Sequence, residues 1–233
     1  MEALIRWRHP ERGLLLPGSF IRAAEQTAVS DDLADWVAQE ACRQAREWHD
    51  AGLHPTISIN VSPDQLRAPA FARRFLDQIE RHGLVPSNFG IELIESAWTV
   101  DALTTLPVIA DLRATGVYLA IDDFGAGYSS LARLRELEFD VLKVDRGLLR
   151  DVPADATAIA VLRAILDLAR ACGSWVVVEG VETEPQRRFL AEHGVDMVQG
   201  FHLGRPQPAE QAAPLLARRL LGHKRNSLIG VGT

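Results

Sequence analysis

The feature that most constrains the fold is a series of short apolar runs that each end on a residue able to bind a metal or transfer a proton. These residues are Asn60, Glu92, Asp122 with Asp123, Lys143, Glu179 and Gln199, and Glu2 lies beside a further apolar run at the start of the sequence. One such residue would mean little. The same placement repeated around a parallel barrel would bring all of these groups to one mouth.

Strands and helices alternate in the sequence pattern. Strands are expected at 56–61, 89–94, 117–121, 141–144, 175–178 and 197–198, and helices at 20–27, 33–48, 71–81, 103–114, 129–137, 157–171 and 185–193. This alternation predicts parallel βαβ units with right-handed crossovers. Their number favours an α/β fold of the TIM-like (β/α)8 barrel type over an open doubly wound sheet.

The length of 233 residues suits one large domain. We expect that domain to occupy residues 1–221, with 222–233 as a flexible tail, because the last residues are small and polar with little periodicity. Apolar residues at 47% and charged residues at 24% exclude a disordered chain. A net charge of -6 gives no general attraction for a nucleic acid polymer, so an anionic ligand would need local cations or metal.

The two cysteines, Cys42 and Cys172, lie in predicted helices without the paired spacing of a zinc site or disulfide framework. We therefore expect buried thiols in a reducing compartment. No apolar run approaches the roughly 20 residues needed to span a bilayer. Met1 is followed by acidic Glu2 rather than by a basic signal region, so the cytoplasm is the expected location.

Asp122 and Asp123 give the sharpest local signal, within the run Asp-Asp-Phe-Gly-Ala-Gly-Tyr-Ser-Ser. Adjacent carboxylates at a strand exit point in different directions, so each can reach a different metal of a two-cation site that clamps a phosphoryl centre. The alternative is an Asp-rich turn that caps a helix near Ser129. The residues at the other strand ends favour the metal site.

Glu2, Asn60, Glu92 and Asp122 are hard oxygen donors, which Mg²⁺ and Mn²⁺ prefer. Taken singly, Asn60 has an alternative as a turn residue before Pro63, and Glu92 as a surface carboxylate on an edge strand. However, Glu92 lies between two apolar residues, so it is expected to point into the barrel, where an unpaired carboxylate is costly.

Lys143 is expected to point inward from a short strand. Among carboxylates it would serve as a counter-ion, an orienter of water or a general base. The alternative is a structural ion pair with Asp145. Trp36 and Trp48 fit core positions of a helix better than a base-stacking platform.

Taken in order, the motifs resemble those of the EAL-type cyclic di-GMP phosphodiesterases. The matching segments are Glu2-Ala3-Leu4 with Ile5-Arg6-Trp7, Asn60-Val61-Ser62, Glu92 to Ser96, Asp122 to Leu131, Lys143 to Arg146, Glu179 to Glu182 and Gln199-Gly200-Phe201. The resemblance extends from Glu2 to about Leu216. So many ordered matches are specific, whereas the EAL triplet alone would carry little weight.

The resemblance implies hydrolysis of one phosphodiester bond in cyclic di-GMP to give linear pGpG, with two Mg²⁺ or Mn²⁺ ions. By position it implies metal ligands at Glu2, Asn60, Glu92, Asp122, Asp123 and Glu179, and catalytic roles for Glu2, Lys143 and Glu179. It implies substrate contacts from Leu4, Arg6, Asp145 and Gln199, and a pair, Glu95 and Glu182, that holds the loop after Asp123.

The family also implies partners. The loop after Asp123 is expected near a homodimer contact, and sensor or diguanylate cyclase domains are expected to be fused to such a chain or to act with it. Family members carry a further strand before the EAL motif, so this barrel is expected to lack the first strand and to have an unpaired edge. Ile94 and Ala126 replace the family's usual threonines without removing a ligand.

Two other functions remain open on the sequence. One is a cyclic di-GMP receptor or regulatory protein-binding module with impaired catalysis. The other is an unrelated magnesium-dependent barrel enzyme such as an aldolase, which does not account for the paired aspartates together with Glu179 to Glu182.

Overall fold

A computed structural model gives the structure of residues 1–27, 29–68, 70–94, 102–127 and 137–222. Its centre is a parallel sheet with the strand order β1-β4-β5-β6-β7-β8-β9. The strands are β1 (Glu2–Ala3), β4 (Ile57–Asn60), β5 (Phe89–Ile94), β6 (Tyr118–Phe124), β7 (Val141–Val144), β8 (Trp175–Val178) and β9 (Met197–Val198). The sheet curls, so the predicted TIM-like barrel is confirmed with seven of its strands, and β1 and β9 form its edges.

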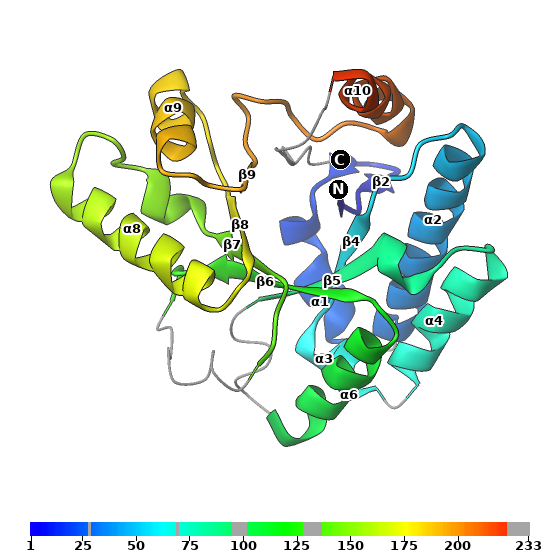
Figure 1. Ribbon diagram of the computed structural model, residues 1–233. Coiled ribbons are helices and arrows are strands. Elements are labelled where there is room, and N and C mark those ends of the chain that lie inside the picture. The colour runs from blue at the N-terminus through cyan, green and yellow to red at the C-terminus, as the bar shows by residue number, and fades with distance from the viewer. Residues whose placement is uncertain (28, 69, 95–101, 128–136, 223–233) are drawn as a thin grey trace.

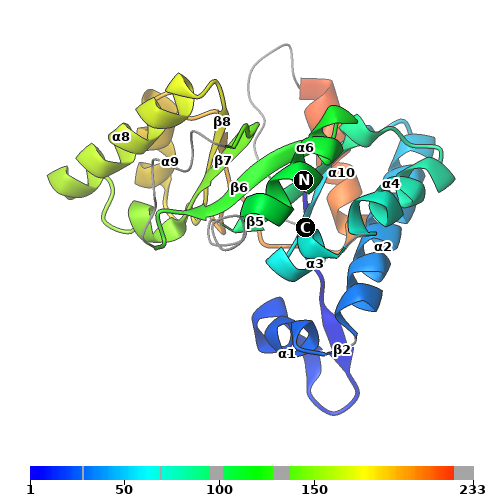
Figure 2. The same cartoon turned by 90° about the horizontal axis from the view of Figure 1, so that it is seen from below.

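Helices cover the outside of the curled sheet (Figures 1 and 2). They are α2 (Ser30–Asp50), α3 (Pro63–Arg67), α4 (Phe71–Arg81), α6 (Ala102–Ala114), α8 (Ala156–Ala171), α9 (Glu184–Glu192) and α10 (Ala209–Gly222), whereas the short helix α1 (Ile21–Glu25) lies apart from the sheet. In α2 the buried residues near the sheet are mostly alanines at helical spacing, including Ala34, Ala38, Ala41 and Ala45. Small side chains let the backbone of this helix approach β4 closely.

Several elements lie outside the predicted pattern. An antiparallel hairpin of β2 (Trp7–His9) and β3 (Gly13–Leu15) projects with α1 below the barrel (Figure 2). Its strands have three residues each, too few for an alternating pattern to be recognised. Helices α3 and α10 were also not predicted. The helix expected at 129–137 falls largely outside the described residues, as does the expected tail after residue 222.

Two predictions about the core are wrong. Trp48 is buried, but Trp36 is 51% exposed. A step of two residues along a helix rotates the side-chain direction by about 200°. Trp36 therefore points away from the face on which Ala34 and Ala38 are buried. Cys42 is buried as expected, whereas Cys172 is exposed because it caps the C-terminus of α8, where that helix ends.

Among the described helices, none has both the length and the apolar character needed to cross a membrane.

Candidate metal centre

Four carboxylates from four different strands or strand ends meet around the ammonium group of Lys143. Its Nζ atom lies 3.2 Å from Oε2 of Glu2, 3.0 Å from Oδ1 of Asp122 and 2.8 Å from Oε1 of Glu179, and it also donates a hydrogen bond to Glu92. The parallel register places these residues at one end of the sheet. The strand-end groups therefore lie together at one end of the sheet, as the sequence pattern predicts.

Lys143 points inward from β7 and is only 3% exposed. Its predicted alternative partner, Asp145, is not among the carboxylates that surround it. Asp145 instead accepts a hydrogen bond from the backbone N–H of Gly147 at 2.8 Å and caps the short 3₁₀ helix Arg146–Leu149. Glu92 is not on an edge strand either, because β5 lies between β4 and β6.

Two amides fix the carboxylate of Glu2. Asn60 Nδ2 donates to Oε1 of Glu2 at 2.9 Å, and Gln199 Nε2 donates to Oε2 at 3.1 Å. Asn60 ends β4 and Gln199 directly follows β9. Asn60 thus orients the Glu2 carboxylate from the neighbouring strand, and Gln199 orients it from the opposite edge of the sheet.

The acidic residues form two groups that share Asp122. One contains Glu2, Glu92 and Asp122, and the other contains Asp122, Asp123 and Glu179; in each, one oxygen per residue lies within 4.8 Å of the others. All of these ligand atoms are carboxylate oxygens, which suit Mg²⁺ or Mn²⁺ better than a thiolate-binding metal. Five carboxylates against one ammonium leave a formal charge of about minus four, which two divalent cations would balance. The residues therefore fit a two-cation centre.

Asp123 has a left-handed backbone with φ of 54°. This conformation is unusual for a residue other than glycine, although aspartate tolerates it better than most. The register of β6 against β7 shifts between Ile121 and Phe124, so both aspartates lie in this irregular part of the strand. Asp123 is exposed beside the buried Asp122 and belongs only to the group that contains Glu179, whereas Asp122 belongs to both groups.

Burial and mutual repulsion shift the pKa values at the centre. Burial raises the pKa of Glu92 and that of Glu179 to about 7, although Lys143 opposes the shift at both residues. Burial disfavours the Lys143 ammonium, but the surrounding carboxylates outweigh it and raise the pKa of Lys143 well above its ordinary value. Burial also opposes ionisation of Glu2, yet Lys143 and the two amides hold the pKa of Glu2 below its ordinary value. Excess negative charge is the main electrostatic feature of the centre.

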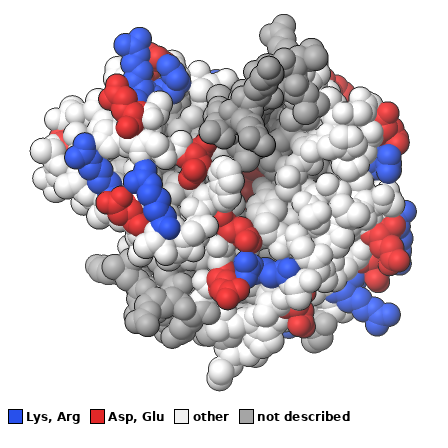
Figure 3. Space-filling model, viewed as in Figure 1, with Lys and Arg blue, Asp and Glu red and all other residues white. Residues whose placement is uncertain are grey.

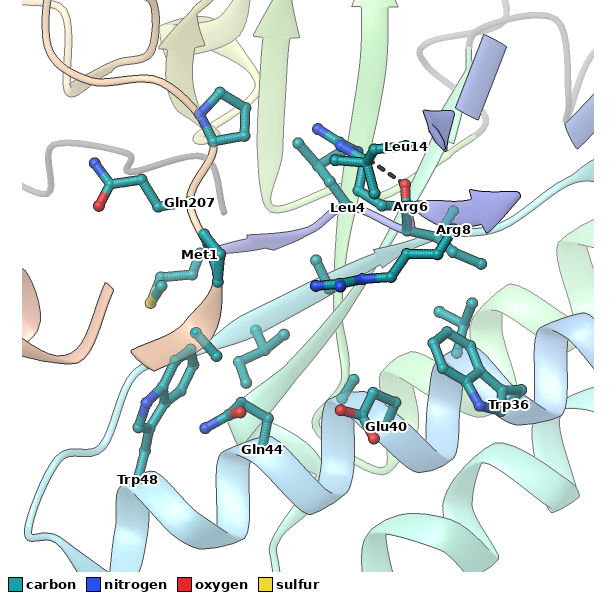
Figure 4. Close-up of a pocket in the computed structure, with 18 residues that line it drawn as sticks. Met1, Leu4, Arg6, Arg8, Leu14, Trp36, Glu40, Gln44, Trp48 and Gln207 are labelled. Atoms are coloured by element: carbon teal, nitrogen blue, oxygen red, sulfur yellow. Dashed lines mark hydrogen bonds between the residues drawn. The ribbon is translucent and has the colours of Figure 1, made fainter. Parts of the chain in front are cut away.

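Other residues predicted for the site lie outside this cluster. Leu4 and Arg6 line an apolar groove of about 390 Å³ between β1, α2 and the segment before α10. Arg6 donates to the carbonyl oxygen of Ile5 at 2.8 Å (Figure 4). Glu182 is exposed, and its backbone N–H donates to Gln186. Glu95 lies outside the described residues, so its predicted pairing with Glu182 stays a prediction.

Sequence reasoning missed Ser58. Its buried hydroxyl donates a hydrogen bond to Oε1 of Glu92. The signal for this role was present, because Ser58 lies between Ile57 and Ile59 and so shares the inward face of its strand with Asn60.

Charge on the outer surface is mixed. On the face that Figure 3 displays, Lys and Arg side chains of the described residues lie beside Asp and Glu rather than in one large basic patch. Ion pairs among the described residues include Arg187 with Glu184 and Arg113 with Asp140.

Known proteins resemble this chain in sequence and in structure. It is 42% identical over 212 residues to the Pseudomonas aeruginosa protein named bifunctional diguanylate cyclase/cyclic di-GMP phosphodiesterase MucR, a match over 91% of this chain and 31% of that protein. A structure described as PaMucR phosphodiesterase in complex with c-di-GMP matches with a TM-score of 0.84 and 43% identity over 90% of this chain and 85% of that one. Klebsiella pneumoniae BlrP1, in a manganese/cy-diGMP complex, matches with a TM-score of 0.74 and 32% identity over 86% of this chain and 49% of that one.

The chain spans about a third of the length of MucR. The sequence model described as the EAL domain matches residues 1–206. The matched part includes every strand of the sheet and all residues of the two acidic groups. The chain belongs to the EAL domain family.

Proposed function

We propose that this chain hydrolyses one phosphodiester bond of cyclic di-GMP and releases linear 5′-pGpG. The observation that carries the proposal is the pair of acidic groups that share Asp122 and surround Lys143. Support also comes from MucR, whose name includes cyclic di-GMP phosphodiesterase activity. In the reaction, water oxygen bonds to phosphorus, the bond from phosphorus to a ribose 3′ oxygen breaks, and the 3′ oxygen takes up a proton.

Two Mg²⁺ or Mn²⁺ ions are the proposed cofactors. Glu2, Asn60, Glu92 and Asp122 would hold one ion, and Asp122, Asp123 and Glu179 the other. Ions of this kind supply charge stabilisation at the phosphoryl group and lower the pKa of bound water. The oxygen-only ligand set and the manganese complex of BlrP1 support this choice.

The chain's own residues orient the reactants. Lys143 directs the attacking water through its ammonium N–H groups, which already point to the centre of the carboxylates. Gln199 and Asn60 keep Glu2 in one orientation through their amide N–H groups. Arg6 binds a substrate phosphate with its planar guanidinium after releasing the carbonyl oxygen of Ile5, and Leu4 and Asp145 complete the substrate contacts.

The proposed partners follow from the family. MucR is about three times the length of the match, so we propose that the chain works with sensor or diguanylate cyclase domains. A homodimer through the loop after Asp123, held by Glu95 and Glu182, is also proposed. The substrate is a bacterial second messenger, and the proposed location is the cytoplasm.

The test is incubation of the purified chain with cyclic di-GMP and either metal, followed by chromatography of the nucleotides. We expect pGpG from the unchanged protein, and no product from Glu2→Ala or Lys143→Ala. Glu47→Ala, which removes an exposed carboxylate from α2, is the matched control and should retain activity. A folded sample that gives no pGpG with either metal would contradict the proposal, and tight binding without product would assign a receptor function instead.

A further inference from the structure

One row of residues crosses four neighbouring strands directly beneath the metal centre. Glu2 pairs in register with Ser58, Ser58 with Gly90, and Gly90 with Tyr118. Glu92 follows Gly90 by two residues on β5, so it points to the same face, one layer nearer the mouth. The row therefore places Ser58 and Tyr118 below the carboxylate of Glu92.

Gly90 allows the ring of Tyr118 to cross β5. A Cβ atom built on Gly90 would lie 2.1 Å from Cζ of Tyr118, far inside van der Waals contact. The ring therefore covers the bare backbone of Gly90 and directs the Tyr118 hydroxyl toward Ser58 on β4. Any larger residue at position 90 would displace the ring.

Ser58 itself contacts the metal centre. Its Oγ atom hydrogen-bonds to Oε1 of Glu92 and lies 3.2 Å from the carbonyl oxygen of Met1. Lys143 donates to the other oxygen of Glu92, Oε2. Both oxygens of Glu92 are thus oriented by the protein, one from the side by an ammonium and one from below by a hydroxyl.

We propose that Ser58 and Tyr118 are positioning residues that fix the Glu92 carboxylate for metal binding, an inference that rests on the proposed function. Ser58 has one proton, which it donates to Glu92, and in this proposal the Tyr118 hydroxyl donates its own proton to the Ser58 oxygen. The proposed chain of hydrogen bonds runs from Tyr118 through Ser58 to Glu92. Groups that orient a metal ligand in this way typically contribute about 10–100-fold to metal affinity or activity.

The experiment measures Mn²⁺ affinity by calorimetric titration of the whole chain, together with kcat and KM for cyclic di-GMP. Ser58→Ala should weaken Mn²⁺ binding about tenfold or more and lower kcat with little change in KM. Tyr118→Phe keeps the ring on Gly90 and should give a smaller loss in the same direction. Ser58→Thr retains a hydroxyl and should restore most of the affinity.

Ser174→Ala is the matched control. Ser174 is also buried, but its hydroxyl donates to the carbonyl oxygen of Phe139 at 3.1 Å, at the start of β8 and away from the metal centre. It should leave Mn²⁺ affinity unchanged. Because Tyr118 acts through Ser58, the double variant Ser58→Ala/Tyr118→Phe should bind Mn²⁺ no more weakly than Ser58→Ala alone.

The outcomes separate this inference from the proposed function. If the unchanged protein binds Mn²⁺ and forms pGpG but Ser58→Ala and Tyr118→Phe bind equally well, the positioning role is wrong. If the unchanged protein neither binds Mn²⁺ nor forms pGpG, the proposed function fails and this inference fails with it. If Ser58→Ala does not fold, the Mn²⁺ affinities of Tyr118→Phe and Ser58→Thr test the positioning role. Weaker binding by Tyr118→Phe and near-normal binding by Ser58→Thr would support it.

Discussion

Gln199 donates a hydrogen bond to Glu2 across the open side of the sheet, with 3.1 Å between Nε2 and Oε2. Glu2 belongs to β1 and Gln199 follows β9, and these strands are the two edges of the sheet. No backbone ladder joins β1 to β9 in the described part of the chain. The side-chain bond is thus a direct link across this gap at the metal centre.

Gln199→Ala should lower the free energy of unfolding of the metal-free protein by about 1–3 kcal/mol, because it removes a hydrogen bond to a buried charged group. Urea denaturation measures the change. The control is Gln211→Ala, an exposed position on α10, which should change stability by less than about 0.5 kcal/mol. Equal stability of the two variants would show that the bond to Glu2 contributes nothing to stability.

Lys143→Met should lower the free energy of unfolding much more than Gln199→Ala does. It leaves four carboxylates without their buried counter-charge, and breaking a buried ion pair on one side costs about 3–5 kcal/mol. Millimolar Mg²⁺ should recover part of the loss, because divalent cations replace the missing positive charge. Urea unfolding with Mg²⁺ and with chelator measures both effects.

Arg43→Met gives the comparison for that experiment. Arg43 bridges Glu40 and Glu47 on the exposed face of α2, where ion pairs contribute at most about 1 kcal/mol. The loss of stability in Arg43→Met should be small and should not depend on Mg²⁺. If Lys143→Met and Arg43→Met unfold at similar urea concentrations, the buried cluster does not depend on Lys143 for its stability.

The strand-end residues were predictable because their signal is local. An apolar run that ends in Glu or Asp is visible in the sequence, and the parallel topology then dictates that the run ends meet. The sequence pattern places Lys143 among carboxylates, but its individual contacts were not predictable from the residues alone. They depend on the register of several strands brought together by the fold, and the nearest acidic residue in sequence, Asp145, is used as a helix cap instead.

Tyr118 and Arg6 illustrate two other limits. The reach of Tyr118 to Ser58 depends on a glycine on the intervening strand, a relationship that no periodicity reveals. Arg6 was assigned to the substrate by family resemblance, but its side chain rests on the carbonyl oxygen of Ile5 in the groove beside α2. A long flexible side chain has several positions of similar energy, so sequence patterns identify its chemistry more readily than its location.

The two cysteines should differ in reactivity. Burial raises the pKa of the Cys42 thiol to about 12, whereas Cys172 is exposed at the end of α8. Since the thiolate is the reactive form, an alkylating reagent at neutral pH should add once per folded chain. Mass spectrometry should locate the adduct at Cys172, and Cys172→Ser should abolish it. Two rapid adducts on folded protein would contradict the burial of Cys42.

The metal-free protein should lose stability as the pH rises from about 5 to 8. Glu92 and Glu179 have folded-state pKa values raised to about 7, above the unfolded value near 4.5. Between these values the folded protein binds more protons than the unfolded chain, so raising the pH favours unfolding. Melting temperatures measured with chelator across this range test the direction.

Glu92→Gln should flatten that pH profile, because the glutamine cannot titrate. In the unchanged protein, saturating Mg²⁺ or Mn²⁺ should make the melting temperature rise with pH instead of falling. Metal binding requires ionised carboxylates and becomes stronger as they lose protons. A metal-free melting temperature that rises steadily from pH 5 to 8 would contradict the raised pKa values.

Asp123→Asn should reduce the number of bound Mn²⁺ ions from two to one. Asp123 belongs to one of the two acidic groups only, so its loss leaves Glu2, Glu92 and Asp122 intact. Asparagine also tolerates the left-handed backbone at φ of 54°, so the fold should be retained. The stoichiometry is measured by calorimetric titration of metal-free protein. Asp145→Asn changes a nearby carboxylate outside both groups and should still bind two ions; two ions on Asp123→Asn would show that the second site does not need Asp123.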